Sequence, residues 1–232
     1  MATALSKPVD RDALVLDSIE RLGLGIRELL KSALGVDPNN VLQRLLARKA
    51  IRSVQGLPQN RAYYVESSEK PFGAQALQQR LAITWHVLMN RCAPRIALKP
   101  AEVTELFGLQ APSGIHVLEA GPKPRVLQVY APETVEVAGG IQRHVEKATS
   151  FPNVAKAIEA GDYGFLVLVP WSSGLESALS AALVGGADLT GIDAGFIAQA
   201  RRLAAIASQA HFAVARVATP ETLTLALKES VS

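Results

Sequence analysis

The 232-residue sequence contains a single cysteine, Cys92, so it cannot form an internal disulfide, and we expect a reducing compartment. Cys92 follows Trp85 and Leu88 at helical spacing, which predicts a buried core thiol rather than a nucleophile. Long apolar runs are also missing. The longest, such as GFLVLVPW, are too short to span a bilayer, and the first residues, MATALSKPVDRD, lack the apolar core of a signal peptide. We therefore expect a cytoplasmic protein with no membrane partner.

The net charge of the chain is small, but its charged residues are unevenly distributed. The formal net charge is +3, with 49% hydrophobic and 19% charged residues, which is a globular composition. The basic excess lies in the first third of the chain, and the segment between Pro38 and Val65 contains no acidic residue. We expect this segment to form a basic surface. Its basic residues are Arg44, Arg48, Lys49, Arg52 and Arg61.

The periodicity of the first 50 residues predicts three helices. The first two cover residues 12–22 and 26–34 and are separated by a Gly-Leu-Gly break. The third opens with Asp37 as the expected N-cap and Pro38 in the first turn. One face of this third helix is apolar, with Val41, Leu42, Leu45 and Leu46. The opposite face is mostly polar, with Asn40, Gln43, Arg44, Ala47 and Arg48.

After the third helix the apolar period changes to two, which predicts a hairpin. The strands are AIRSV (50–54) and AYYVE (62–66), and Gly56 and Pro58 turn the chain in the loop QGLPQNR between them. Since neighbouring residues on a strand point to opposite faces, at least one of two adjacent tyrosines, Tyr63 and Tyr64, should pack on the core. Three helices followed by a hairpin resemble a winged helix-turn-helix, an α+β domain that we assign to residues 1–67, followed by a linker over 68–73.

The resemblance implies that the third helix enters the major groove of double-stranded DNA, while the hairpin lies along the backbone. Asparagine, glutamine and arginine match the donor and acceptor edges of adenine and guanine. Winged helices also serve as protein-docking modules, and that alternative stays open. The expected base-edge residues are Asn40, Gln43 and Arg44. The residues expected to contact the DNA backbone are Arg48, Lys49, Arg52 and Arg61, together with Gln59 and Asn60 in the hairpin loop.

Residues 74–232 alternate between helical and strand patterns, which predicts an α/β domain with a mixed sheet of about five strands flanked by helices. The expected strands are 95–98, 114–121, 125–132, 165–169 and 211–217. The expected helices are 73–91, 100–108, 133–150, 153–160, 173–184, 195–209 and 220–229.

This element order resembles the restriction-endonuclease-like fold, and the whole layout is similar to the replication-relaxation family of plasmids and mobile elements. Active nucleases of that fold bind a divalent metal through an acidic residue on one strand and Glu-x-Lys on the next. Here Glu119 could supply the first carboxylate, but Gln128 and Tyr130 stand where Glu and Lys are needed. The four histidines are scattered, without zinc-like spacing. We therefore expect no catalytic residues, no metal and no cofactor.

We expect a non-enzymatic DNA-binding protein that regulates transcription or the replication of a plasmid or mobile element. A homodimer is a candidate assembly, because two half-sites multiply a modest single-site affinity. Two alternatives stay open. One is a small-molecule-responsive regulator, with the second domain as the sensor. The other is a metal-dependent nuclease with displaced ligands, for which the candidates are Glu102, Glu105, Glu119 and Glu133.

Overall fold

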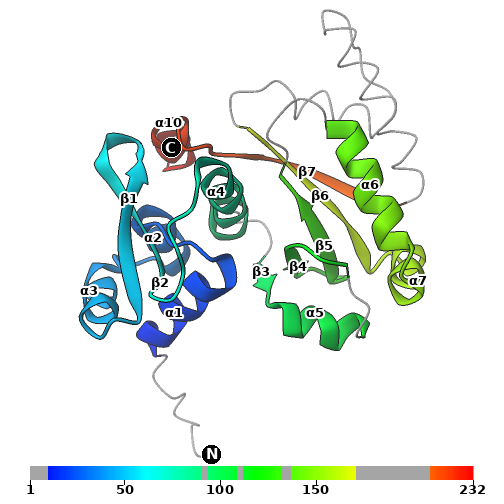
Figure 1. The fold of residues 1–232 in the computed structure, drawn as a ribbon, viewed down its shortest axis with the longest axis horizontal. Coiled ribbons are helices and arrows are strands. Elements are labelled where there is room, and N and C mark those ends of the chain that lie inside the picture. The colour runs from blue at the N-terminus through cyan, green and yellow to red at the C-terminus, as the bar shows by residue number, and fades with distance from the viewer. Residues whose placement is uncertain (1–9, 90–93, 109–111, 132–136, 171–209, 232) are drawn as a thin grey trace, which may run out of the picture. The chain divides into compact units, whose positions relative to one another are not determined.

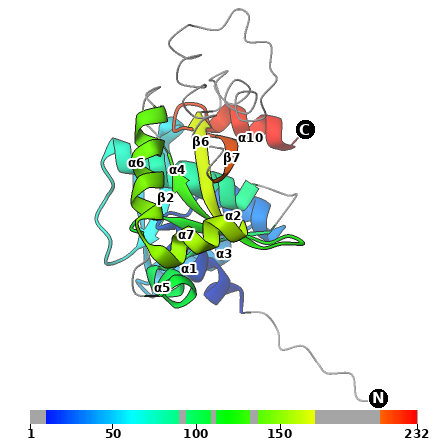
Figure 2. The ribbon, with the colours of Figure 1, turned by 90° about the vertical axis from the view of Figure 1, so that its right-hand side faces the viewer.

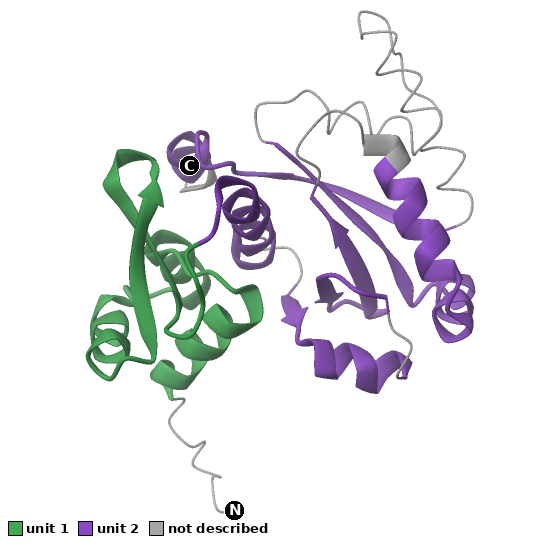
Figure 3. Ribbon diagram, viewed as in Figure 1, with its two compact units in different colours: residues 1–71 green, residues 72–232 purple. Residues whose placement is uncertain are grey.

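The chain divides into two compact units, residues 1–71 and 72–232, and the division falls within the expected linker (Figure 3). The helices expected over 173–184 and 195–209 lie outside the described residues, as do Cys92 and Glu133. The computed structural model describes residues 10–89, 94–108, 112–131, 137–170 and 210–231.

The described part of unit 1 consists of helices followed by a hairpin (Figure 1). The strands pair antiparallel, with a register shift between Gln55 and Leu57, and a short 3₁₀ turn over Pro58–Asn60 connects them. The elements are α1 (Arg11–Leu22), α2 (Arg27–Leu34), α3 (Asn39–Ala47), β1 (Ile51–Leu57) and β2 (Arg61–Glu66).

Local signals set the boundaries of α1, and packing of one face of each helix forms the core. The Asp10 carboxylate accepts hydrogen bonds from the backbone N–H groups of Asp12 and Ala13, which caps the first turn of α1. Gly23 ends the helix in the left-handed conformation. The core of unit 1 includes Val15, Ile19, Leu29, Leu42, Leu45, Ile51, Tyr63 and Val65. Tyr63 therefore satisfies the expectation that one of the adjacent tyrosines packs inside.

The hairpin is tied to the segment between α1 and α2 by a two-way backbone bridge. Gly25 N–H donates to the Tyr64 carbonyl and Tyr64 N–H donates to the Gly25 carbonyl, both at 2.8 Å. A Cβ on Gly25 would lie 2.7 Å from Cγ1 of buried Ile19, so the bridge needs a glycine here. One residue of extended chain thus joins the hairpin as a minimal third strand.

Two boundary predictions in unit 1 were wrong. Pro38, not Asp37, is the N-cap residue, and α3 begins at Asn39, although the Asp37 carboxylate still accepts the Asn39 N–H at 3.0 Å. The loop predicted over 55–61 is shorter, because β1 runs on to Leu57. Leu57 is buried, and its side chain keeps the strand on the core past Gly56.

Unit 2 contains the expected mixed five-stranded sheet, in the order β3-β4-β5-β6-β7. β3, β4 and β5 form an antiparallel meander, and β5, β6 and β7 are parallel. The described strands are β3 (Arg95–Leu98), β4 (His116–Glu119), β5 (Arg125–Tyr130), β6 (Tyr163–Pro170) and β7 (His211–Val217). The described helices are α4 (Ala74–Met89), α5 (Pro100–Phe107), α6 (Val137–Thr149), α7 (Pro152–Ala160) and α10 (Leu223–Val231).

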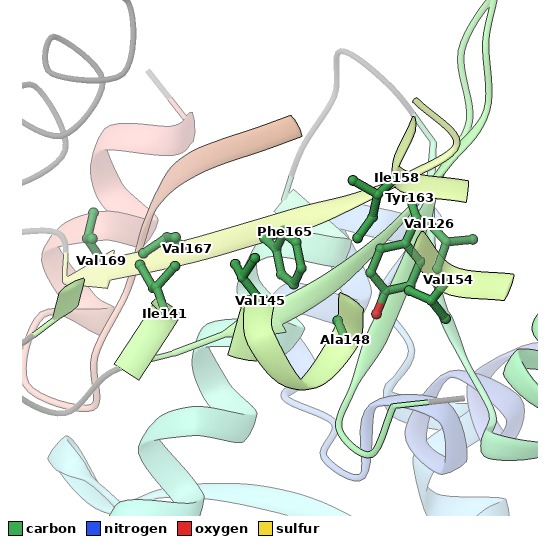
Figure 4. Close-up of a cluster of buried hydrophobic side chains, with 10 residues drawn as sticks. All are labelled: Val126, Ile141, Val145, Ala148, Val154, Ile158, Tyr163, Phe165, Val167 and Val169. Atoms are coloured by element: carbon green, nitrogen blue, oxygen red, sulfur yellow. The ribbon is translucent and has the colours of Figure 1, made fainter. Parts of the chain in front are cut away.

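Helices of unit 2 cover both faces of the sheet, as its apolar strands predict. α6 and α7 lie on one face and α4 on the other (Figures 1 and 2). The core under α6 and α7 contains ten buried residues (Figure 4). They are Val126, Ile141, Val145, Ala148, Val154, Ile158, Tyr163, Phe165, Val167 and Val169.

The face of the sheet that α4 covers carries charged side chains at one end of the strands. Arg95 on β3 pairs with Glu119 on β4, with Arg95 Nη2 and Glu119 Oε1 2.5 Å apart. Arg125 on β5 reaches across β6 to His211 on β7, where its Nη1 lies 3.0 Å from the ring Nε2. The residue crossed is Gly164, which pairs with His211 and leaves space for this contact.

Candidate nucleic-acid interface

The face of α3 expected to contact DNA is exposed along its whole length. Val41, Leu42 and Leu45 are buried against the core of unit 1. The helical period therefore turns the other side of α3 to solvent. The exposed residues on this side include Asn40, Gln43 and Arg44, which are expected to read base edges. They also include Arg48, which is expected to contact the DNA backbone.

Arg44 is held by a carboxylate from another helix. Its Nε donates to Asp12 Oδ2 at 3.1 Å and its Nη2 donates to Asp12 Oδ1 at 2.5 Å. Arg48 Nη2 lies 3.6 Å from Asp12 Oδ2, so the two arginines share one carboxylate. The hydrogen bond from Arg44 lowers the pKa of Asp12 below its ordinary value, and the charges of Arg44 and Arg48 add to this. Asp12 is ionised at neutral pH.

The arginines of the hairpin are also engaged within the chain. Arg52 donates to the backbone carbonyl of Glu69, and Arg61 Nε lies 3.5 Å from Glu28 Oε1 on α2. The segment between Pro38 and Val65 contains no acidic residue of its own. The fold nevertheless brings two carboxylates to its basic residues, Asp12 from α1 and Glu28 from α2.

The remaining candidates surround the ends of the hairpin. Lys49 follows α3 with a φ of 56°, and no ion pair joins its side chain to a described residue. Gln59 and Asn60 form the turn, with φ of 61° and 55°, and both side chains are exposed. Consecutive left-handed residues other than glycine are uncommon, and asparagine tolerates this region better than most. The turn therefore presents two amides to solvent.

In unit 2, Gln128 stands where the nuclease motif needs a glutamate, and it belongs to a neutral hydrogen-bonded group. The Tyr163 hydroxyl lies 3.0 Å from His116 Nε2 on β4 and donates to Gln128 Oε1 on β5 at 3.1 Å. Gln128 Nε2 donates to the carbonyl of Ser113. Burial lowers the pKa of His116 to about 4 and raises that of Tyr163. None of these side chains carries charge at pH 7.

The carboxylates considered as displaced metal ligands serve other contacts or lie apart. Glu119 accepts two hydrogen bonds from Arg95. Glu102 caps α5 by accepting the Lys99 N–H at 2.8 Å, and Glu105 is exposed on the same helix. Across the described ranges, no three His, Cys, Asp or Glu side chains are grouped so that they could hold a metal ion.

Comparison with known proteins adds no family. No family model, curated protein or solved structure matches the chain. Among the residues with described positions, no helix has both the length and the apolarity needed to cross a bilayer.

A small pocket bears on the ligand-sensing alternative. It lies between α4 and the carboxyl ends of β5, β6 and β7, with Gln78, Gln79 and Thr219 among its lining residues. Its volume is about 10 Å³, which is room for about one water molecule. In the described part of unit 2, this pocket is too small for an effector molecule.

Sequence reasoning found the exposed face of α3 but missed the acidic residues that pair with Arg44 on α3 and Arg61 on β2. Asp12 and Arg44 are 32 positions apart, and Glu28 and Arg61 come from separate elements. No short-range pattern connects either pair. An ion pair between two surface helices could be found only once the packing of α1 against α3 is known.

Proposed function

We propose that the protein binds double-stranded DNA through unit 1, with that unit acting as a winged helix and α3 as its recognition helix. The observation that carries the proposal is the exposed face of α3, where Asn40, Gln43, Arg44 and Arg48 follow one another at helical spacing. The order of helices and strands supports it, together with the bridge between Gly25 and Tyr64.

Each group of residues has a distinct role in this proposal. Asn40, Gln43 and Arg44 face base edges in the major groove, where amides and guanidinium groups recognise adenine and guanine. Arg48 and Lys49 contact phosphates, which adds affinity without sequence information. Gln59 and Asn60 place the tip of the hairpin against the backbone. Arg52 and Arg61 contribute to the phosphate contacts only after giving up the internal partners described above.

Unit 2 is proposed to be a restriction-endonuclease-like scaffold without a metal site. The neutral group of His116, Gln128 and Tyr163 supports this, because it offers no carboxylate to a divalent cation. The role that fits is regulation of transcription or of plasmid or mobile-element replication. Pairing of two copies on two half-sites would raise the affinity of each recognition helix.

Fluorescence anisotropy of a labelled random duplex at two salt concentrations tests the proposal. The wild type should bind with a strong salt dependence, and Arg44→Ala/Arg48→Ala should lose most of this binding. The matched control, Lys123→Ala/Lys156→Ala, removes the same charge from exposed positions of unit 2 and should bind like the wild type. Equal binding by all three proteins, or none by the wild type, would remove α3 as a DNA-reading element.

Two single substitutions separate base reading from backbone contact. Arg44→Ala should relax the preference at one base pair, with a loss on the order of 1–3 kcal/mol there. Arg61→Ala should weaken binding to all sequences about equally and flatten the salt dependence. The measurement is competition by a panel of duplexes, each altered at one position, against a site selected from a randomised library.

A further inference from the structure

The contact between Asp12 and Arg44 uses one particular edge of the guanidinium group. Asp12 takes the Nε–H and one N–H of Nη2, through two different carboxylate oxygens. A guanidinium group has five N–H donors in a planar fork. The pair of donors at the far end, one on Nη1 and the other on Nη2, is not used by Asp12.

Arg44 lies on the proposed recognition face, where most of its side chain is open to solvent. The Arg44 side chain is 57% exposed, whereas Asp12 is only 16% exposed. The two end donors match the O6 and N7 acceptors of guanine, the pairing by which arginine most often reads DNA. A guanidinium group fixed in its plane loses less conformational freedom on binding than a free one.

Asp12 itself is poorly placed to read a base. A carboxylate can accept from the amino group of cytosine. Both oxygens of Asp12 already accept hydrogen bonds from Arg44, and Oδ2 also lies 3.6 Å from Arg48 Nη2. A carboxylate close to the phosphate backbone weakens binding to every sequence. The contribution that Asp12 can make to recognition is therefore the orientation of Arg44.

We propose that Asp12 is a positioning residue that fixes Arg44 to read a guanine through O6 and N7. The inference rests on the proposed function and adds the identity of the base that Arg44 recognises. In this role, Asp12 lowers the affinity for duplexes of any sequence and raises the selectivity for guanine. Without it, Arg44 would be a mobile cation able to bind any phosphate or acceptor edge.

The test uses the full chain and its selected duplex, together with duplexes in which each guanine in turn is replaced by adenine or by 7-deazaguanine, which lacks the N7 acceptor. For one guanine, the wild type should lose roughly tenfold in affinity on either replacement. With Asp12→Asn, the same ratio should fall to about twofold, while affinity for random duplex stays equal or rises. In an Arg44→Ala background, Asp12→Asn should leave the ratio unchanged.

The matched control is Asp17→Asn, which breaks an ion pair on the same helix, with Arg21 at 2.7 Å, that involves no residue of α3. It should keep the full guanine preference. Asp12→Glu retains the carboxylate and should restore part of the ratio. Circular dichroism of each variant should give the wild-type helical signal, because none of the substitutions removes the Asp10 side chain that caps α1.

The outcomes separate the two proposals. If the wild type shows no salt-dependent duplex binding, the proposed function fails, and this inference fails with it. If the wild type binds but no guanine depends on Arg44, or if Asp12→Asn keeps the full ratio, only the role of Asp12 is overturned. A uniform loss of affinity for all duplexes in Asp12→Asn also overturns it, because that result marks a purely structural residue.

Discussion

Buried histidines link the stability of unit 2 to pH at the level of single residues. His86 on α4 is 5% exposed, and burial, with the charge of Arg95 adding to it, lowers its pKa to about 3. Among the residues that the structure describes, its Nε2 has no hydrogen-bond partner. The pKa of His116 is lowered to about 4. Both are neutral in the folded chain at pH 5, whereas in the unfolded chain histidine gains a proton near pH 6.5.

Acid should therefore destabilise the protein before its carboxylates titrate. A depressed folded pKa gives stability that is present above pH 6.5 and is lost as the pH falls toward the folded value. Each histidine should contribute a slope approaching about 1.4 kcal/mol per pH unit below pH 6. Urea unfolding at pH 7, 6 and 5, followed by tryptophan fluorescence, measures it. Burial also lowers the pKa values of His144 and His211, which add to the slope. His86→Leu should make the slope shallower by the share that His86 contributes, and an unchanged slope would contradict the assignment.

Tyr163 should be a sensitive position because its hydroxyl completes a buried network. Tyr163→Phe leaves His116 Nε2 and Gln128 Oε1 without that partner. Leaving a buried polar atom unsatisfied costs about 1–3 kcal/mol, so the free energy of unfolding should fall by at least that amount. Equilibrium urea unfolding measures the change. Recovery of stability in Tyr163→Phe/His116→Phe/Gln128→Leu would show that the cost came from the stranded partners.

At the scale of elements, the inner strand β6 depends on a glycine. A Cβ on Gly164 would lie 2.6 Å from the backbone oxygen of His211 on β7 and 3.2 Å from its Cβ. Backbone atoms in a sheet cannot move aside as a flexible side chain can. Gly164→Ala should therefore destabilise unit 2 by roughly 1–3 kcal/mol. Gly121→Ala is the control, since a Cβ there meets nothing within 4 Å and the change should be nearly neutral in thermal unfolding.

The sequence predicted most elements because local physical chemistry determines them. Alternating apolar residues gave the hairpin, and the continuous apolar run over Phe165–Val169 gave the buried strand β6, which extends over Tyr163–Pro170. Boundaries were less predictable, as the N-terminus of α3 and the end of β1 show. The partners of Arg44 and Arg61 could not be predicted, because charges on separate elements meet only through tertiary packing.

On the scale of the whole molecule, the charged residues and the tryptophans are unevenly distributed between the two units. Residues 1–71 contain eleven basic and eight acidic residues, whereas residues 72–232 contain thirteen of each. The formal net charge of +3 therefore belongs to unit 1. Both tryptophans, Trp85 and Trp171, belong to unit 2, so tryptophan fluorescence reports on that unit alone.

The stability of each unit should depend on the packing of its own core, so a substitution in one core should shift the unfolding transition of that unit. Leu45 is fully buried in unit 1, and Leu45→Ala should cost that unit about 2–5 kcal/mol. The helical signal in circular dichroism should then show an earlier transition for unit 1, while the tryptophan transition keeps its midpoint. An equal shift of both signals would mean that the two units unfold as one cooperative body.

The pair formed by Asp12 and Arg44 also limits how this surface could be transplanted. A chimera that received only residues 39–47 would inherit Arg44 without the carboxylate that holds it. We expect such a graft to bind DNA with little discrimination, however faithfully the helix is copied. Under the proposed role of Asp12, the smallest transferable unit is helix α1 together with helix α3, and a library designed to alter the sequence preference would vary the first turn of α1 as well as α3.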